Sequence, residues 1–390
     1  MLTRASARRE AREIVSRLRW RLLATGRDLT DRFGILGHLE RLRVLRSDHR
    51  RASRARAVVA TLLGSLGEVA GDSGAPGSWR AHEMLRTSSD LTILTAGPPN
   101  GPFRALIKIA ETRSAADMLD WQRRTLLTLR EDERLGDWRS LLPHVLAAGE
   151  ADGTAYLVEE RIAGTDLQFA LARPGDHSPA LRGAGEAISR LHRATASDAT
   201  IGPEILDRWV RRPIAALAAG VGRSSATRTS QAALARLAED LCTTLEGLVV
   251  TISWVHGDYS PGNILTGPDG RVSGIIDWEF AHPQDLPALD VVTLLLTARM
   301  CVRRQELGQI VCDILDGPRW SDAEASLVGA AYGMGVEGAI TTETVVLLCW
   351  LRHVARMISR HRRYVDRALW IHGNVDSVLE SLARPASNGH

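Results

Sequence analysis

The sequence predicts an α+β protein, with a small lobe of five strands and one helix followed by a larger, mainly helical lobe. Three observations lead to this fold class. Short runs with strand-like alternation, separated by turn residues, fill the region from residue 79 to residue 160. Beyond Gly164 apolar residues recur at helical spacing. Before Trp79 a stretch of glycine, serine and proline separates both lobes from an arginine-rich, helical N-terminal segment.

Composition places the chain among globular proteins. Hydrophobic residues make up 44% and charged residues 24% of its 390 residues, and this length allows two or three domains with cores of their own. The apolar runs fall short of the roughly 20 residues that span a bilayer, and the N-terminus lacks the apolar segment of a signal peptide. We therefore expect a cytoplasmic protein. The four cysteines lack CxxC spacing, which predicts free thiols.

Charge is unevenly distributed along the chain. Residues 1–56 contain 16 arginines and 6 acidic residues, a balance of +10, and since the whole chain carries +3 the remainder sums to −7. A mildly acidic body disfavours nucleic-acid binding. We expect residues 1–70 to form a basic helical extension and residues 71–78 a linker. The amphipathic residues 4–27 either pack on the small lobe or make weak contact with an anionic membrane surface or an acidic partner.

The small lobe is assigned to residues 79–160. Polar turns join its strands, and the Asp152-Gly153 pair is typical of a two-residue hairpin. The expected strands cover residues 79–85, 91–96, 103–110, 145–148 and 155–159, with a helix between the third and the fourth.

The larger lobe is assigned to residues 161–390. One β segment, formed by residues 263–265 and 272–277, is expected to interrupt its helices. The expected helices cover residues 180–194, 203–219, 227–247, 286–303, 304–316, 321–332 and 341–361.

The strongest motif is His256-Gly257-Asp258, followed by Asn263 and, at the end of an apolar run, Asp277. Phosphoryl transfer needs oxygen ligands that hold Mg²⁺ against the phosphates, cations on the phosphates, and a carboxylate that orients the acceptor hydroxyl. Asp258 is expected to face the acceptor hydroxyl. Asn263 and Asp277 are expected to offer oxygen atoms to Mg²⁺, because this ion prefers hard oxygen ligands.

The pattern HGDxxxxN, followed by Ile-Asp-Trp-Glu at residues 276–279, resembles the aminoglycoside phosphotransferase and choline kinase superfamily. The resemblance covers about residues 80–300. It implies a bilobal, protein-kinase-like fold and ATP- and Mg²⁺-dependent transfer of the γ-phosphate to a hydroxyl of a small molecule. It further implies that His256 acts with Asp258 in catalysis and that Asp290 braces the catalytic loop.

Lys108 is the only lysine among the 49 basic residues of the chain. A planar guanidinium does not replace a compact ammonium in a tight phosphate pocket, so the position that keeps lysine is a candidate phosphate contact. The strand that ends at Lys108 also resembles the strand that carries the phosphate-binding lysine of kinases. The residue that pairs with Lys108 is left open between Gln122, on the following helix, and Glu111 or Asp120.

Two further segments are candidates for nucleotide binding. Backbone N–H groups around Ser88 and Ser89, in the turn between the first two strands, are expected to cradle phosphates although the turn lacks a glycine-rich motif. Residues 156–164 resemble the hinge between the lobes of the family. Adenine is expected there, on backbone groups near Glu160 and Ile162.

The acceptor is not specified by the sequence, and a sugar, a nucleoside, an antibiotic or an amino alcohol would fit. A stripe of arginines at helical spacing is either a solvated face or a substrate-side patch, and as a patch it favours a neutral or anionic acceptor over a polycationic one. The stripe consists of Arg352, Arg356, Arg360 and Arg363. An alternative to the enzyme is a pseudokinase-like protein that binds a nucleotide or a partner without catalysis. A protein kinase is disfavoured, because Gly257 stands where those enzymes have arginine.

Overall fold

The computed structural model describes residues 58–59, 62, 79–85, 90–98, 103–221, 228–317, 320–332, 340–360 and 368–384. The predictions for residues 1–57, which include the amphipathic residues 4–27, for the linker, and for Ser88 and Ser89 lie outside these residues. The chain divides into two compact units. The first comprises Met1–Leu119 and Leu146–Glu159, and the second comprises Asp120–Val145 and Glu160–His390.

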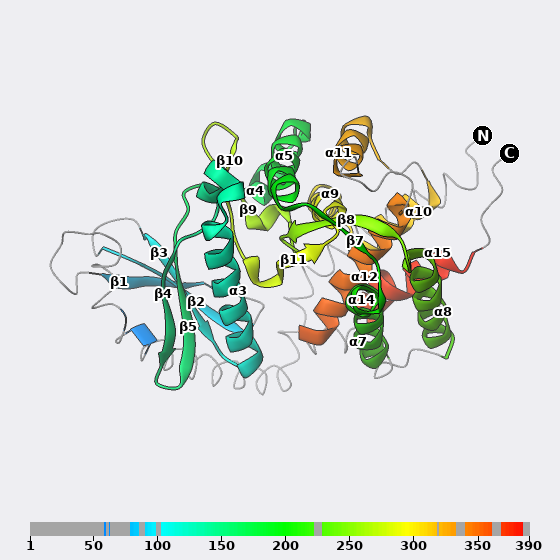
Figure 1. The fold of residues 1–390 in the computed structure, drawn as a ribbon, viewed down its shortest axis with the longest axis horizontal. Coiled ribbons are helices and arrows are strands. Elements are labelled where there is room, and N and C mark those ends of the chain that lie inside the picture. Colours follow the sequence, from blue (N-terminus) through cyan, green and yellow to red (C-terminus); the bar gives the residue numbers. More distant parts are fainter. Residues whose placement is uncertain are drawn as a thin grey trace, which may run out of the picture. The chain divides into compact units, whose positions relative to one another are not determined.

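The first unit is built on a five-stranded sheet in the order β1-β2-β3-β5-β4 (Figure 1). All five predicted strands are present, with ends that lie within three residues of the prediction. They are β1 (Arg80–Leu85), β2 (Leu91–Gly97), β3 (Ala105–Ala110), β4 (Val145–Ala151) and β5 (Thr154–Glu160). β2 pairs antiparallel with both β1 and β3. Asp152 and Gly153 have φ values of 50° and 68°, the left-handed conformation that a tight hairpin between β4 and β5 requires.

One apolar cluster forms the core of this unit. Ile107 and Ile109 of β3 and Val158 of β5 are buried in it together with Val58 and Leu62, which precede the sheet in sequence. The helix that follows β3 is α3 (Arg113–Glu131), at the predicted place. The apolar spacing along α3 gives it one buried side, formed by Leu119, Leu126 and Leu129.

The second unit is mainly helical, as predicted. Its α-helices are α4 (Leu167–Leu171), α5 (Ser178–Thr195), α6 (Pro203–Leu206), α7 (Arg212–Val221), α8 (Arg228–Leu245), α9 (Ala288–Arg303), α10 (Leu307–Asp316), α11 (Asp322–Tyr332), α12 (Thr342–Arg360), α14 (Ala368–Ile371) and α15 (Ser377–Leu382). The predicted helix ends differ from the structure by up to three residues, and the largest difference is at the start of α10. Arg304 takes the left-handed conformation, with φ of 52°, so α9 ends there and the next helix begins at Leu307 instead of residue 304.

Shorter helical turns complete this unit. The 3₁₀ segments are η2 (Glu133–Leu141), η4 (Pro261–Asn263) and η5 (Trp278–Phe280), and the π-helical segments are η3 (Asp207–Arg211) and η6 (His372–Asp376).

The prediction of a single β segment in the larger lobe was wrong, because the second unit contains two three-stranded sheets. One has the order β10-β9-β6 and the other the order β11-β8-β7. Their strands are β6 (Thr165–Asp166), β7 (Ser197–Thr200), β8 (Val249–Val255), β9 (Ile264–Thr266), β10 (Val272–Ile275) and β11 (His282–Asp285). All three strands of the second sheet were missed. β7 and β11 are short and polar and carry little alternation, whereas β8 has a β-branched run that could have been recognised as a strand.

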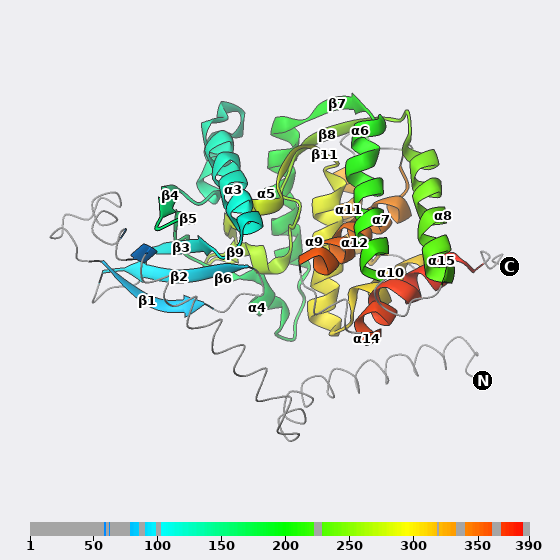
Figure 2. The same ribbon diagram turned by 90° about the horizontal axis from the view of Figure 1, so that it is seen from below.

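Two apolar clusters fill the second unit. One is formed by residues of helices α7, α8, α9, α10 and α12. Helices α7 and α12 lie side by side, as Figures 1 and 2 show. The other lies beneath the segment that links β8 to β10, where Trp138 and Trp278 meet edge to face with ring centroids 6.0 Å apart. Tyr259 of the linking segment is fully buried in it. This second cluster anchors the predicted catalytic loop.

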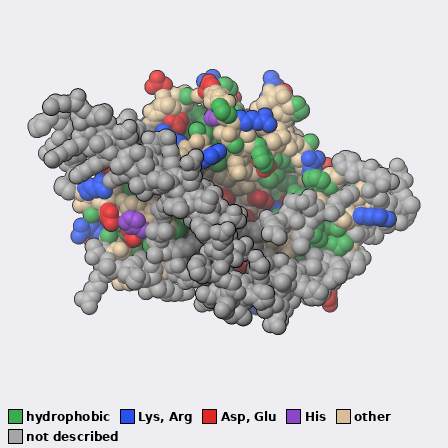
Figure 3. Space-filling model, turned by 180° about the vertical axis from the view of Figure 1, so that it is seen from behind, with side chains coloured by type: hydrophobic (Ala, Val, Ile, Leu, Met, Phe, Trp, Pro, Cys, Tyr) green, Lys and Arg blue, Asp and Glu red, His purple; other side chains and the backbone are tan. Residues whose placement is uncertain are grey.

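The surface of the described residues carries mixed charge. On the face seen in Figure 3, acidic and basic side chains lie interspersed among apolar ones. Among the helices that the structure describes, none has the length and apolar character needed to cross a membrane.

Candidate active site

The loop between β8 and β9 has a backbone that only glycine permits at its second position. Gly257 has φ of 76°, and a Cβ atom there would collide with the carbonyl oxygen of Phe280. This glycine lets the loop turn directly out of β8 towards Asp258. The glycine of the His-Gly-Asp motif is therefore a backbone requirement.

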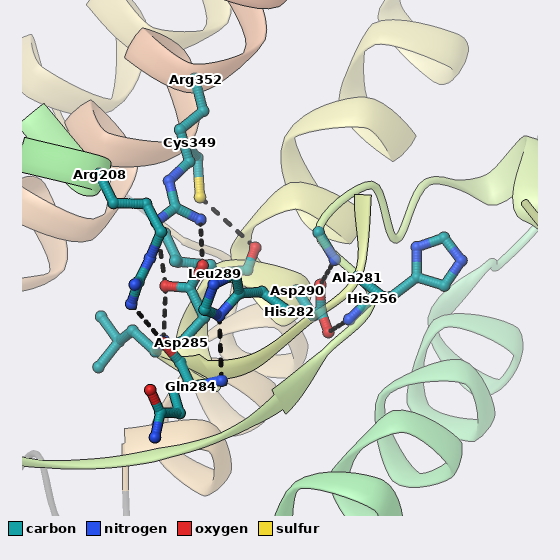
Figure 4. A network of polar contacts seen from close by, with 12 residues as sticks. Arg208, His256, Ala281, His282, Gln284, Asp285, Leu289, Asp290, Cys349 and Arg352 are labelled. Carbon is teal, nitrogen blue, oxygen red and sulfur yellow. Dashed lines mark hydrogen bonds and ion pairs between the residues drawn. The ribbon is translucent and has the colours of Figure 1, made fainter. Parts of the chain in front are cut away.

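Asp290, near the N-terminus of α9, is hydrogen-bonded to the backbone of this turn. Its Oδ2 accepts hydrogen bonds from the backbone N–H of His256 (2.7 Å) and from Nε2 of His192 (3.0 Å), and its Oδ1 accepts one from the N–H of Gly257 (2.9 Å). Figure 4 shows its carboxylate reaching the backbone beside His256. Burial alone raises the pKa of Asp290, but hydrogen bonding to His192, the nearby histidines and the backbone N–H of His256 outweigh burial and hold the pKa below its usual value. The geometry supports the predicted bracing role.

We expect Asp290→Asn to lower the free energy of unfolding by about 3 kcal/mol, because an amide cannot accept all three hydrogen bonds. Chemical denaturation at neutral pH measures this. Since the folded-state pKa is lowered, the stabilisation is complete above the ordinary carboxyl pKa and is lost only as the pH falls through the lowered value. Asp137→Asn, at an ion pair where the Asp137 side chain is 89% exposed, is the control. Equal effects of the two substitutions would contradict the bracing role.

His256 is completely buried, and both of its ring nitrogens are engaged. Nε2 lies 2.8 Å from the carbonyl oxygen of Ile276, and Nδ1 accepts a hydrogen bond from the N–H of Asp258 (3.3 Å). The ring also contacts Trp278 with centroids 4.7 Å apart. This geometry favours a positioning role for His256 over the catalytic role that the sequence analysis predicted.

Asp258 and Asn263 are joined within the loop. Nδ2 of Asn263 donates to the backbone oxygen of Asp258 (2.9 Å), which fixes the amide so that its Oδ1 points to the opposite side. The Asp258 side chain remains 32% exposed. One side chain can therefore meet an acceptor while the other presents an amide oxygen.

The sheet β10-β9-β6 brings three polar residues to one of its ends. Asn263 precedes β9 and Asp277 follows β10. Because β9 and β10 are antiparallel, the two residues lie at the same end of the sheet. The N–H of Ile276 also donates a hydrogen bond to the carbonyl oxygen of Asn263 (3.0 Å). Asp166 ends β6, which is also antiparallel to β9. Burial first, and then the charge of Asp277, raise the pKa of Asp166. Asp166 was not predicted, since β6 has only two residues.

Asp277 adopts a conformation that is uncommon for a residue with a side chain, with φ of 62° and ψ of 61°. Such backbone strain persists where the surrounding structure imposes it, and functional sites are enriched in it. Within the described residues no cluster of three or more His, Cys, Asp and Glu side chains suits a metal ion. Asn263 and Asp277 nevertheless fit Mg²⁺, because this ion takes one or two protein oxygen ligands and completes its shell with water and substrate phosphates.

Arg356 of α12 lies against Asp258. Its Nη1 is 3.0 Å from Oδ1 of Asp258, and its Nη2 donates to the carbonyl oxygen of Gly257 (2.8 Å). The guanidinium stacks on Phe280, with its central carbon 3.5 Å from the ring centroid. Burial lowers the pKa of the neighbouring His353 to about 4, so its imidazole is neutral at pH 7.

Arg352, one helical turn before Arg356, is bound to Asp285. Its Nη1 and Nη2 donate to the two carboxylate oxygens of Asp285 at 2.8 and 3.0 Å. Arg208 lies beside this pair and donates to the backbone oxygen of Gln284 (2.6 Å), as Figure 4 shows. The side chains of Arg352 and Arg356 are 18% and 19% exposed, so for these two arginines the solvated-face alternative was wrong. The side chains of Arg360 and Arg363 lie outside the described part of the chain.

In the first unit, Lys108 forms an ion pair with Glu159 of β5. Its Nζ is 3.0 Å from Oε2 of Glu159, and the two side chains are 3% and 2% exposed. The sequence offered three candidate partners for Lys108, and Glu159 was not among them. Glu111 instead accepts a hydrogen bond from Thr92 (2.7 Å), and Asp120 pairs with Arg123 and Arg124 on the surface of α3. Gln122 is buried in α3.

The predicted hinge is tied to its surroundings by hydrogen bonds to backbone carbonyl oxygens. The N–H of Glu160 donates to the carbonyl oxygen of His144 (2.8 Å), and the hydroxyl of Ser273 donates to the carbonyl oxygen of Ala163 (2.8 Å). The N–H of Glu160 is therefore used within the protein. For adenine binding, this leaves the carbonyl oxygen of Glu160 and the backbone groups of Ile162 as the candidates.

Comparison with known proteins identifies the class of protein. Residues 87–320, more than half of the chain, match the model of the phosphotransferase enzyme family, APH. The chain belongs to this family of transferases, as the resemblance predicted, and its small five-stranded unit and mainly helical unit confirm the predicted fold class.

Solved structures of the same class resemble the chain at low sequence identity. An aminoglycoside-3'-phosphotransferase of type VIII is 18% identical, with a TM-score of 0.49 over 79% of this chain and 99% of that one. A choline kinase from Cryptosporidium parvum Iowa II is 12% identical, with a TM-score of 0.46 over 80% of this chain and 87% of that one. A glucosamine kinase is 15% identical, with a TM-score of 0.40 over 84% of this chain and 97% of that one. No curated protein matches the sequence.

Proposed function

We propose that the protein is a kinase that transfers the γ-phosphate of ATP, in the presence of Mg²⁺, to a hydroxyl of a small molecule. The observation that carries this proposal is the placement of Asp258, Asn263 and Asp277 on one loop and one sheet end, with the turn of the loop held by the buried Asp290. A carboxylate for the acceptor and two oxygen ligands for a metal are the parts that phosphoryl transfer requires.

Each residue then has a separate task. Asp258 accepts the hydrogen bond of the acceptor hydroxyl and orients it for attack on the γ-phosphorus. It takes up the hydroxyl proton as the new oxygen–phosphorus bond forms and the bond from the γ-phosphorus to the bridging oxygen breaks, with ADP as the leaving group. Asn263 and Asp277 would hold Mg²⁺, which when bound neutralises the phosphate oxygens. Asp290 and His256 keep the turn in the conformation that presents Asp258.

Lys108 would neutralise the phosphates of ATP. Glu159 supports this assignment, because a buried ammonium needs a fixed carboxylate to stay charged and in place. Two features of the sequence favour the non-catalytic alternative, Gln122 at the helix position and a nucleotide loop without the glycine-rich motif. The Glu159 partner on β5 weakens the first of them. The complete set of Asp258, Asn263 and Asp277 supports catalysis.

We expect Lys108→Arg to raise the KM for ATP about tenfold or more, since the larger planar guanidinium cannot occupy the buried position of the ammonium. Steady-state kinetics over a range of ATP concentrations measures this. Arg113→Lys, at an exposed position of α3, is the control and should leave the KM unchanged. Wild-type kinetics in the Lys108→Arg variant would exclude Lys108 from phosphate binding.

The proposed function is tested by a screen for ATP consumption over sugars, nucleosides, amino alcohols and hydroxylated antibiotics, each with and without Mg²⁺. We expect ADP formation that requires the metal and rises with one class of acceptor. ADP formation that is absent in every arm, or equal without a divalent metal, would contradict the proposal.

A further inference from the structure

Arg356 is a fixed part of the surroundings of Asp258. Three different groups hold its guanidinium: the carboxylate of Asp258, the carbonyl oxygen of Gly257 and the ring of Phe280. A surface arginine samples many rotamers, whereas this side chain is only 19% exposed and is bound at both its edge and its face. Its positive charge therefore has a defined position in the site.

That position lies close to any group that Asp258 orients. Nη1 is 3.0 Å from one oxygen of the carboxylate. A hydroxyl bound to the other oxygen lies at about 2.7 Å from it, which places the reacting oxygen on the order of 6 Å from the guanidinium. Substituents on the carbon atoms next to the reacting hydroxyl then come within the range of an ion pair with Arg356.

The carboxylates on the α12 side of Asp258 are already paired with guanidinium groups. Arg356 pairs with Asp258, and Arg352, one helical turn earlier, pairs with Asp285, with Arg208 beside that second pair. A polyammonium acceptor needs carboxylates that it can pair with, and it could use these two only by breaking an existing ion pair.

His353 does not add a charge to this group at neutral pH. Burial lowers the pKa of its imidazole to about 4, while the charge of Asp258 acts to raise this pKa and the charge of Arg356 acts to lower it. A neutral imidazole donates one hydrogen bond through one ring nitrogen and accepts one at the other.

We propose that Arg356 selects the acceptor by its charge, and that the acceptor is a hydroxyl compound carrying a carboxylate or phosphate group near the reacting hydroxyl. The inference rests on the proposed function, through the role given there to Asp258. A guanidinium attracts a carboxylate and a phosphate alike, so both sources of negative charge satisfy the same residue. A polyamine such as an aminoglycoside is the acceptor that this arrangement rejects.

The test compares acceptors that share a sugar ring and differ in charge. Glucose, glucosamine, glucuronate, glucose 6-phosphate and kanamycin are each supplied with ATP and Mg²⁺, and ADP formation is measured above the rate without acceptor. We expect kcat/KM for glucuronate or glucose 6-phosphate to exceed that for glucosamine and kanamycin at least tenfold. Glucuronate and glucose 6-phosphate separate a carboxylate from a phosphate acceptor.

Three variants connect this preference to Arg356. Arg356→Gln should lose the preference for anionic acceptors, mainly through a higher KM for the anionic sugar. Arg356→Lys should keep part of this preference, and Arg356→Glu should reverse the order of the acceptors. The order is compared within each protein, so a lower overall rate does not obscure it. Arg236→Glu, on the exposed side of α8, makes the same change of charge and should keep the wild-type order. Circular dichroism melts verify that each variant is folded.

Three outcomes would overturn the inference. They are a wild-type preference for kanamycin or glucosamine, an order that is unchanged in the Gln and Glu variants, and a wild-type enzyme that none of the five compounds activates. A different result would contradict the proposed function. That result is the absence of Mg²⁺-dependent ATP turnover both with each acceptor and in the reaction without an acceptor.

Discussion

Asp258→Asn should lower the rate of phosphate transfer by about 100- to 10,000-fold, the range typical of removing a general base. The amide keeps the size of the side chain but can neither take the proton of the acceptor hydroxyl nor attract it with a negative charge. Because Asn263 and Asp277 are untouched, nucleotide binding in the presence of Mg²⁺ should change little. Single-turnover kinetics with the best acceptor from the screen measures the chemical step directly.

The control for this variant is Asp269→Asn. Asp269 lies in the turn between β9 and β10, where its side chain accepts a hydrogen bond from the N–H of Arg271 (3.1 Å). The substitution removes the same charge from the neighbouring turn without touching the loop that carries Asp258. If Asp258→Asn kept more than about a tenth of the wild-type rate, Asp258 would have no place in the mechanism.

Asp277→Asn should weaken Mg²⁺-dependent nucleotide binding and lower turnover by about 100-fold or more, because the ion loses its one charged protein ligand. Asn263 offers a neutral amide oxygen and cannot compensate for the lost charge. Isothermal titration with ADP, with and without Mg²⁺, measures the binding. Since Asp277 is strained, a thermal melt should accompany the titration, and a gain in stability with loss of binding would fit a strained functional residue.

The residues of the catalytic loop could be predicted because their spacing is local. Asp258, Asn263 and Asp277 are close in sequence, and the short hairpin between them leaves few arrangements. Glu159 could not be found in this way. It is 51 residues from Lys108, and only the order of the sheet, in which β3 and β5 are neighbours, brings the two side chains together. A sequence pattern gives strands but not their order.

The arginine stripe on α12 illustrates a second limit. Helical spacing placed Arg352 and Arg356 on one side of a helix, which the structure confirms, but it gave no information about what that side faces. Asp285 and Asp258, the two partners, come from segments 67 and 98 residues earlier. The same holds for β7 and β11, whose short polar sequences become strands because β8, with its run of β-branched residues, lies between them.

The most direct test of the account measures Mg²⁺-dependent ADP binding and phosphate transfer side by side in wild type, Asp258→Asn and Asp277→Asn. The division of tasks between the two carboxylates predicts that Asp258→Asn binds ADP as wild type does and fails to transfer phosphate. It predicts that Asp277→Asn loses both Mg²⁺-dependent ADP binding and phosphate transfer. Two variants with the same pattern of loss, or loss of ADP binding in Asp258→Asn alone, would contradict the assignment of Asp258 to the acceptor and Asp277 to the metal.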